Sequence, residues 1–212
     1  MKNMKKKYQA IYFDFDGTLC NSTNVMVEII NESAKKFSFR ETTLEEVRHT
    51  PLHEALKEIL FLKIPFIIWR QKKMMGKRIK ECPPYEGVRE LLETLLKEDI
   101  QVGILSSNNK KNIRSFFQGW GDAFEKIEIV EAGLFNKHKR IKKILRQKKY
   151  APQEMLYVGD ELRDYQAAQK SGVDCLLYTY GQSSRALLNR EKISDDLLMD
   201  APKDLLQKIG VL

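Results

Sequence analysis

The sequence predicts an α/β fold in which a parallel sheet is flanked by helices and a small all-helical segment is inserted after the first strand. From about residue 86 onward, short apolar runs alternate with amphipathic stretches, as in parallel βαβ units. Between the first strand and that region the periodicity is helical only. The chain has 212 residues, 42% of them hydrophobic, which suffices for one domain plus an insertion.

The first strand is predicted at residues 11–13 and the insertion follows it. Val25, Ile29 and Ala34 mark one face of a first helix. The segment 42–46 offers an N-cap with Glu three residues on, and Pro51 interrupts the second helix. A third helix is predicted over 66–79, and a Pro- and Gly-containing segment at 82–87 ends the insertion. We therefore expect a core of residues 1–20 and 86–212 and a helical cap of residues 21–85.

The rest of the core is predicted as alternating helices and strands. The tail from Gln182 to Leu212 shows helical, amphipathic spacing and is expected to be peripheral packing. The predicted elements are a helix around 88–96, a strand at 100–105, a helix at 110–117, a strand at 126–130, a helix at 139–148, a strand at 155–158, a helix at 164–171 and a strand at 175–178.

Composition favours a cytoplasmic protein that does not enter a membrane. The apolar run 59–69 is broken by Lys63 and Pro65, is too short to span a bilayer, and is expected to be a buried cap element. Four lysines within the first eight residues precede no apolar segment of signal-peptide length. The three cysteines are widely spaced, which is typical of free thiols in a reducing compartment.

The formal charge of +8 does not by itself indicate nucleic acid, because the basic residues are spread along the chain, with local density at 2–7, 70–80 and 137–149. A solvated basic surface is the simpler interpretation, and a positive field would gather anionic phosphate esters. The expected partner is a small phosphorylated metabolite. The expected assembly is a monomer or a homodimer.

Two carboxylates stand directly after the first strand, at Asp14 and Asp16, and a Gly-Thr turn follows. Asp14 is the candidate nucleophile, because a carboxylate can attack phosphorus and form an aspartyl phosphate. Asp16 is the candidate acid and base for the leaving alcohol and the attacking water. Gly17 permits close backbone approach and Thr18 can fix the loop. Alternatively, the acids merely cap the next element.

Acids facing a dianionic phosphate require a cation, and hard oxygen ligands indicate Mg²⁺. The predicted ligands are Asp14, Asp16 and Asp160, the last at the end of a later strand. Asp164 lies four residues on, one helical turn away, and is a supporting residue of the same cluster. The alternative for this pair is an N-capping Asp followed by a surface acid.

Phosphate oxygens need donors, and Ser106, Ser107 and Asn108 supply hydroxyl and amide groups where a strand meets a helix. The two serines are candidate phosphate ligands and Asn108 a supporting residue, although all three are also ordinary helix caps. A fixed cation should complement the transferred group. Lys137 is the candidate for both catalysis and phosphate binding, and Lys139 is its rival.

Asp14 to Thr18, Ser106, Lys137 and Asp160 with Asp164 resemble, in order and spacing, the four motifs of the haloacid dehalogenase superfamily. The resemblance implies a Rossmann-like core, a nucleophilic Asp14, an acid and base at Asp16, and phosphate binding by Ser106 and Lys137. It also implies Mg²⁺ bound by the side chains of Asp14 and Asp160 and the carbonyl of Asp16. Asp164 would serve the metal from a second position, and the N–H of Gly17 would contact phosphate.

The placement and helical character of the cap resemble the phosphoglycolate phosphatase-like branch of that superfamily. A Mg²⁺-dependent phosphomonoester hydrolase is therefore expected, with phosphoglycolate as one candidate substrate and Arg48, His49, His53 and Arg70 as possible partners for its carboxylate. Two alternatives stay open. One is a sugar phosphomutase of the same fold, and the other is a catalytically silent protein that binds phosphate or nucleic acid.

Overall fold

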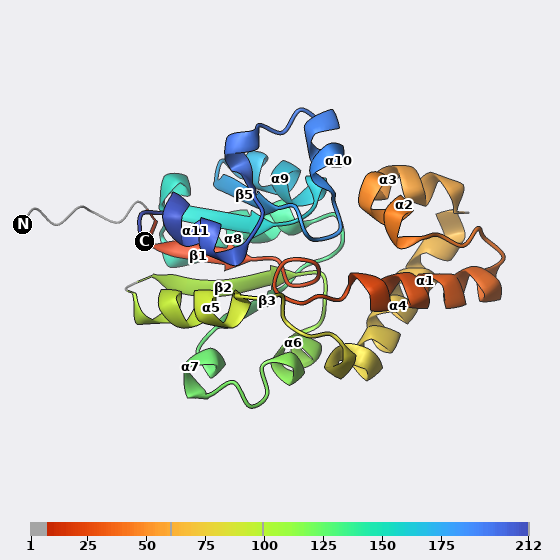
Figure 1. Cartoon of the computed structure of the whole chain (residues 1–212), viewed down its shortest axis with the longest axis horizontal. Coiled ribbons are helices and arrows are strands. Elements are labelled where there is room, and N and C mark those ends of the chain that lie inside the picture. Colours follow the sequence, from red (N-terminus) through yellow and green to blue (C-terminus); the bar gives the residue numbers. More distant parts are fainter. Residues whose placement is uncertain (1–7, 60, 99, 212) are drawn as a thin grey trace, which may run out of the picture.

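The computed structural model describes residues 8–59, 61–98 and 100–211, shown as a cartoon in Figure 1. Two features singled out in the sequence, the lysines at 2–7 and Leu60, lie outside the described residues. Within the described part, an α/β core carries a separate group of helices at one end (Figure 1). No helix of that part is both long and apolar enough to cross a bilayer.

Six strands of the described chain form one sheet in the order β3-β2-β1-β4-β5-β6, and every neighbouring pair is parallel. This confirms the predicted fold class. Parallel strands are joined by crossovers, so helices cover both faces and the central strands are apolar on both sides. The strands are β1 Ala10–Phe13, β2 Gln101–Ser106, β3 Glu128–Glu131, β4 Met155–Gly159, β5 Asp174–Tyr178 and β6 Leu198–Met199.

Alternate residues of the strands feed two hydrophobic layers. Ile11 and Phe13 point to a layer completed by α5 Val88–Lys97, α6 Lys110–Phe116 and α11 Pro202–Lys208. Ala10 and Tyr12 point to the opposite layer, which includes residues of α8 Lys137–Lys148, α9 Leu162–Gln169 and α10 Arg185–Arg190. A short helix, α7 Asp122–Glu125, precedes β3. The sheet is therefore rigidly held from both faces.

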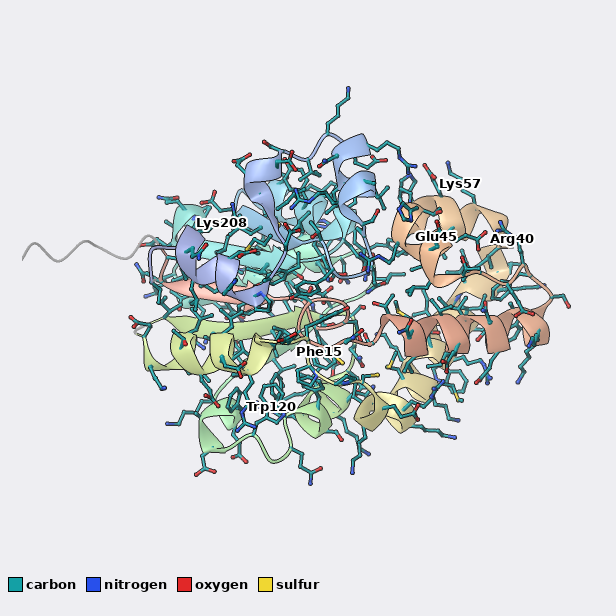
Figure 2. The ribbon with its side chains drawn as sticks, viewed as in Figure 1. Phe15, Arg40, Glu45, Lys57, Trp120 and Lys208 are labelled. Atoms are coloured by element: carbon teal, nitrogen blue, oxygen red, sulfur yellow. The ribbon has the colours of Figure 1, made fainter. Side chains whose placement is uncertain are left out.

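The cap follows β1 and is helical. Its helices are α1 Thr23–Phe37, α2 Leu44–His49, α3 Leu52–Ala55 and α4 Ile64–Arg78, with short 3₁₀ turns at Leu56–Glu58, Phe61–Lys63 and Ile79–Glu81. Thr43 and Glu46 form the capping box that opens α2, and Pro51 separates α2 from α3, as predicted. Figure 2 labels Glu45 on α2, Arg40 in the loop between α1 and α2 and Lys57 in the 3₁₀ turn after α3, together with Trp120 and Lys208 on the core. The boundaries 21 and 85 stay predictions.

Two expectations about packing are corrected by the structure. The apolar run near residues 59–69 is not a buried element, because Leu62, Phe66 and Trp69 are 73%, 63% and 62% exposed. Only one face of α4, which includes Ile67, turns toward α1. The tail after Gln182 is not merely helical and peripheral, since it contributes β6 to the sheet.

Candidate active site

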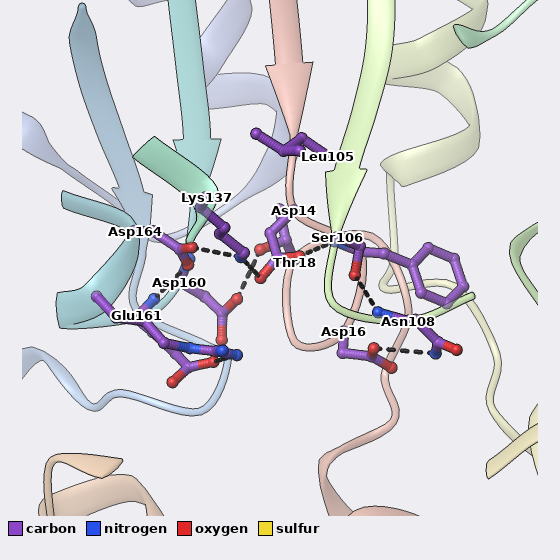
Figure 3. A network of polar contacts seen from close by, with 12 residues as sticks. Asp14, Asp16, Thr18, Leu105, Ser106, Asn108, Lys137, Asp160, Glu161 and Asp164 are labelled. Atoms are coloured by element: carbon purple, nitrogen blue, oxygen red, sulfur yellow. Dashed lines mark hydrogen bonds and ion pairs between the residues drawn. The ribbon is translucent and has the colours of Figure 1, made fainter. Parts of the chain in front are cut away.

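The candidate residues meet at the carboxyl ends of β1, β2 and β4. Asp14 follows β1, Ser106 ends β2 and Asp160 follows β4. In the observed strand order β1 and β4 are neighbours whose crossovers run in opposite directions, which is the position where open parallel sheets bind ligands. Figure 3 shows these side chains gathered below the ends of the strands.

Asp14 and Lys137 form a buried ion pair. Lys137 begins α8, and its Nζ donates to Oδ2 of Asp14 at 2.5 Å and to Oδ1 of Asp164 at 2.6 Å (Figure 3). All three side chains are at most 2% exposed. Lys139, the predicted rival, is exposed on the next part of the same helix. The structure therefore brings Lys137, and not Lys139, to the cluster of acids.

Burial and ion pairing have opposite effects on the pKa values of Asp14, Asp164 and Lys137. Burial raises the pKa of Asp14 to about 6, and Lys137 only partly offsets it. Burial would likewise favour the neutral form of Asp164, but Lys137 and Arg163 hold its pKa below the ordinary value. Burial opposes the charge of Lys137, yet Asp14 and Asp164 raise its pKa above the ordinary value. The lysine is thus a fixed cation beside the candidate nucleophile.

Asp160 is held in place by its neighbours on both sides. Thr18 Oγ1 donates to its Oδ1 at 2.6 Å, and the backbone N–H of Gln182 donates to its Oδ2 at 2.7 Å. Gly17 has φ +80°, and a Cβ there would lie 2.2 Å from Asp160 Oδ2, so the turn requires glycine. Gly181 is equally confined, since a Cβ would lie 2.4 Å from both Asp160 Oδ2 and Gly17 O. Two glycines therefore let the backbone enclose this carboxylate.

The donor set fits a divalent cation. One carboxylate oxygen each from Asp14, Asp160 and Asp164 lies within 4.8 Å of the others, and all three residues are buried. Burial, with the neighbouring acids, also raises the pKa of Asp160 well above its ordinary value. Three carboxylates facing the single ammonium of Lys137 leave an excess of negative charge that a hard cation would offset. The charge of Arg163 also lowers the pKa values of Asp14 and Asp164, but Arg163 is ion-paired with Glu161, so this pair adds no net positive charge.

Asp164 has a second function in the local fold. Its Oδ2 accepts hydrogen bonds from the backbone N–H groups of Asp160 and Glu161, at 3.3 and 3.1 Å. It thereby caps α9 while its other oxygen binds Lys137. The alternative of an N-capping Asp160 followed by a surface acid is wrong, because Glu161 is the N-cap residue and Asp164 is buried, with one oxygen on the start of α9 and the other on Lys137.

Asp16 lies on the side of Asp14 away from Asp160 (Figure 3). Its carboxylate accepts from Ser22 Oγ at 2.9 Å and from Asn108 Nδ2 at 3.0 Å. Burial raises its pKa, with these two hydrogen bonds opposing. Its carbonyl oxygen accepts from Gln182 Nε2 at 3.2 Å. The side chain is thus oriented by two hydrogen bonds while its pKa is raised, which suits a general acid.

Ser106, Ser107 and Asn108 form the turn after β2. Ser106 is fully buried, and its Oγ accepts from the backbone N–H of Asn108 at 3.1 Å. Ser107 is half-buried and, like Asn108, lines a cavity that extends under the cap. This turn therefore places hydroxyl and amide donors beside Asp14 and Asp16.

Sequence reasoning missed Gln182, and it named four cap cations only as possible partners of a substrate carboxylate. Gln182 contacts both Asp160 and Asp16, although no motif marks it; the adjacent Gly-Gln-Ser-Ser segment after β5 was the available signal. Arg48 donates to the carbonyls of Thr179 and Tyr180, both at 2.9 Å, so it joins the cap to the core.

The other cap candidates differ in position. Arg70 bonds Glu32 and Ser33 on α1. His49 is exposed and contacts the carbonyl of Glu45. His53 lines the cavity under the cap. Of the four predicted partners for a substrate carboxylate, only His53 therefore faces that space.

A helical cap over a parallel sheet, with a buried Asp–Lys pair and further carboxylates at the strand ends, defines a phosphoryl-transfer class of hydrolase. The family profile of haloacid dehalogenase-like hydrolases matches residues 11–178. The phosphoglycolate phosphatase of Synechococcus elongatus is 30% identical over 213 residues, covering 96% of this chain and 98% of the relative. A pyrophosphatase of Bacillus mycoides is 24% identical over 210 residues, covering 94% and 96%.

The fold agrees with solved structures of the same kind. A haloacid dehalogenase-like hydrolase from Streptococcus pneumoniae superposes with a TM-score of 0.77 at 20% identity, covering 95% of this chain and 98% of that one. The chain belongs to the haloacid dehalogenase-like hydrolase family. It is a phosphatase similar to phosphoglycolate phosphatase.

Proposed function

We propose that this phosphatase hydrolyses phosphate monoesters of small metabolites with Asp14 as nucleophile. The observation that carries the proposal is the position of Asp14, buried at the end of β1 between Lys137 on one side and Asp16 on the other. Lys137 offsets charge on the transferred phosphoryl group, and the turn at Ser106 and Ser107 supplies further donors. Phosphoglycolate is one candidate substrate, because the relative from Synechococcus elongatus bears that name.

The reaction divides into two displacements. In the first, an oxygen of Asp14 bonds to phosphorus while the ester oxygen leaves and takes a proton from Asp16. In the second, Asp16 accepts a proton from a water molecule whose oxygen attacks phosphorus, and the Asp14 carboxylate is released with inorganic phosphate. The raised pKa of Asp16 keeps a proton available for the first displacement.

The cofactor we propose is Mg²⁺, held by Asp14 and Asp160, by the carbonyl of Asp16 and, from a second position, by Asp164. When bound, it would supply positive charge to the phosphoryl oxygens. Thr18 and Gln182 keep the Asp160 carboxylate oriented, and Gln182 also bonds the carbonyl of Asp16. The cytoplasmic location stays a prediction.

The test compares phosphate release by the native chain and by Asp14→Asn, using a panel of esters that includes phosphoglycolate, with Mg²⁺ and with a chelator. The exposed Asp122, at the start of α7, provides the control Asp122→Asn. We expect release that requires the metal, a loss on the order of 10³-fold or more in Asp14→Asn, and a control within about twofold of native. Acid-quenched native enzyme should carry phosphate on Asp14. Substantial turnover by Asp14→Asn would refute the nucleophile assignment.

A further inference from the structure

A cavity of about 380 Å³ joins the candidate active site to the interior of the cap. Its volume lies within the range of roughly 300–1,000 Å³ found for small-molecule sites. At the core end it is lined by residues that also belong to the site or to the loops around it. They include Asp16, Ser107, Asn108, Glu161, Arg163, Gln182 and Ser183.

The cap end of the cavity is mainly apolar. It is enclosed by side chains of α1, α2 and α4 and by the segment that follows α3. Gln71 also lines it, and its Oε1 has no hydrogen-bond partner within the described residues, so this acceptor is available to a ligand. Polar side chains at this end also include Glu46, Thr50, His53 and Lys72. The apolar lining includes Met26, Ile30, Val47, Leu56, Ile67 and Met75.

The proposed mechanism fixes which part of a substrate enters this space. The ester oxygen leaves with a proton from Asp16, so the alcohol must extend from that carboxylate. Asp16 lines the cavity, whereas Asp160 and Lys137 lie on the other side of Asp14 and do not. The leaving alcohol therefore occupies the cavity, and the phosphate group stays with Asp14.

We infer that the substrates are phosphate monoesters whose alcohol is bulky and mainly apolar, such as an alkyl or aryl group of six or more carbons. This inference rests on the proposed function and adds the substrate class. Removing such a group from water into an apolar cavity contributes binding energy in proportion to its area. A two-carbon carboxylate would leave most of the cavity unfilled and would face hydrocarbon side chains.

A rival class consists of small acidic esters, for which the cavity offers His53 and Lys72 as cations. Arg40 also lines the cavity but is ion-paired with Glu46. Arg48 and Arg70 do not line it; they bond core carbonyls and Glu32. Arg163, at the core end, is ion-paired with Glu161, and its Nε has no hydrogen-bond partner within the described residues. The rival therefore depends on Lys72, on His53 and on the Nε–H of Arg163, and the Lys72→Met variant tests the first of these.

The first experiment measures kcat/KM of the native chain with Mg²⁺ for linear alkyl phosphates from ethyl to octyl, below their micelle concentrations, and for phosphoglycolate. A buried methylene should raise kcat/KM about fourfold, so four added methylenes should give about 10²-fold. Alkylphosphonates of the same lengths, which cannot be hydrolysed, should inhibit more strongly as the chain grows. This second readout needs no variant.

The second experiment partly fills the cavity. Val47 lines it, whereas Leu44, on the same helix α2, is 37% exposed and does not. We expect Val47→Trp to lower kcat/KM for octyl phosphate about tenfold or more while changing ethyl phosphate less than about threefold. Leu44→Trp should leave both within about twofold. Lys72→Met should not reduce octyl phosphate turnover.

The outcomes separate the two proposals. If no ester of any length is hydrolysed by folded, metal-loaded protein, the proposed function fails. If esters are hydrolysed but kcat/KM and phosphonate inhibition are flat or fall with chain length, the substrate inference fails while the function stands. It also fails if phosphoglycolate exceeds octyl phosphate and Lys72→Met removes that preference.

Discussion

Replacing Lys137 by Met removes the ammonium group that is ion-paired with both buried carboxylates, Asp14 and Asp164. Because all three side chains are at most 2% exposed, we expect the free energy of unfolding to fall by about 3–5 kcal/mol, as when a buried ion pair is broken. Breaking a surface ion pair costs less. At about 2–4 °C per kcal/mol for a chain of this size, the Tm should fall by about 6–20 °C in the presence of a chelator. Phosphatase activity should fall about 10²–10³-fold.

The matched control is Lys139→Met, one half-turn along α8 and exposed, which should change stability by less than about 0.5 kcal/mol. Calorimetry with chelator and phosphate release with Mg²⁺ are the two assays. If Lys137→Met does not fold, Lys137→Met combined with Asp164→Asn removes one of the two orphaned charges and should regain part of the Tm. Equal Tm values and equal activities for Lys137→Met and Lys139→Met would refute the reasoning.

The same variant has a predictable pH dependence. Without the ammonium, burial acts on Asp14 and Asp164 with only Arg163 and, for Asp164, a backbone hydrogen bond opposing it, so we expect their pKa values in the folded state to lie above the unfolded value of about 3.9. An acid whose pKa is higher in the folded than in the unfolded state destabilises the fold as the pH rises from the unfolded pKa through the folded pKa. The Tm deficit of Lys137→Met relative to native protein should therefore be smaller at pH 5 than at pH 8.

Three further substitutions test the contact between cap and core, the backbone beside Asp160 and the proposed general acid. Arg48→Ala removes two 2.9 Å hydrogen bonds between cap and core and should lower kcat/KM about tenfold, whereas the exposed neighbour His49→Ala should stay within about twofold. Gly181→Ala places a Cβ 2.4 Å from Asp160 Oδ2 and should reduce metal-dependent activity about 10²-fold. Titration calorimetry of native protein and variant measures their affinities for Mg²⁺. Asp16→Asn should slow alkyl esters about 10²–10⁴-fold but p-nitrophenyl phosphate much less, because that leaving group needs no proton.

The sequence was sufficient for the strands β1 to β5, because their signals are local, whereas the two-residue strand β6 was missed. Buried parallel strands are short apolar runs, and the amphipathic helices between them have a clear period, so β1, β2, β4 and β5 fall within one or two residues of their predicted bounds. The polar residues at the strand ends also follow from topology, since parallel strands finish at one edge. The grouping of Asp14 with Asp160 needed only the inference that the sheet is parallel.

What the sequence could not supply depends on contacts between distant segments. Gln182 reaches Asp160 and Asp16 only because the loop after β5 folds back over the turn at Gly17. Composition could not distinguish the buried side of α4 from its exposed side, where Phe66 and Trp69 lie. The residue type and local pattern of a Gln or an aromatic residue do not indicate which distant residue it contacts. Such contacts are found only in the three-dimensional structure.

The charge of the cluster connects the cofactor to the substrate. Among the described residues, Asp14 and Asp164 are ion-paired with Lys137 and Asp160 lies beside them, and a phosphate monoester brings up to two further negative charges into the same buried space. Repulsion at this depth is weakly screened, so the ester should bind poorly unless a divalent cation is also present. Because coupling between two ligands is reciprocal, an alkylphosphonate should raise the affinity for Mg²⁺ by the factor by which Mg²⁺ raises the affinity for the phosphonate. Titration calorimetry of Asp14→Ala should show this coupling weakened, since that variant removes one of the charges that creates it.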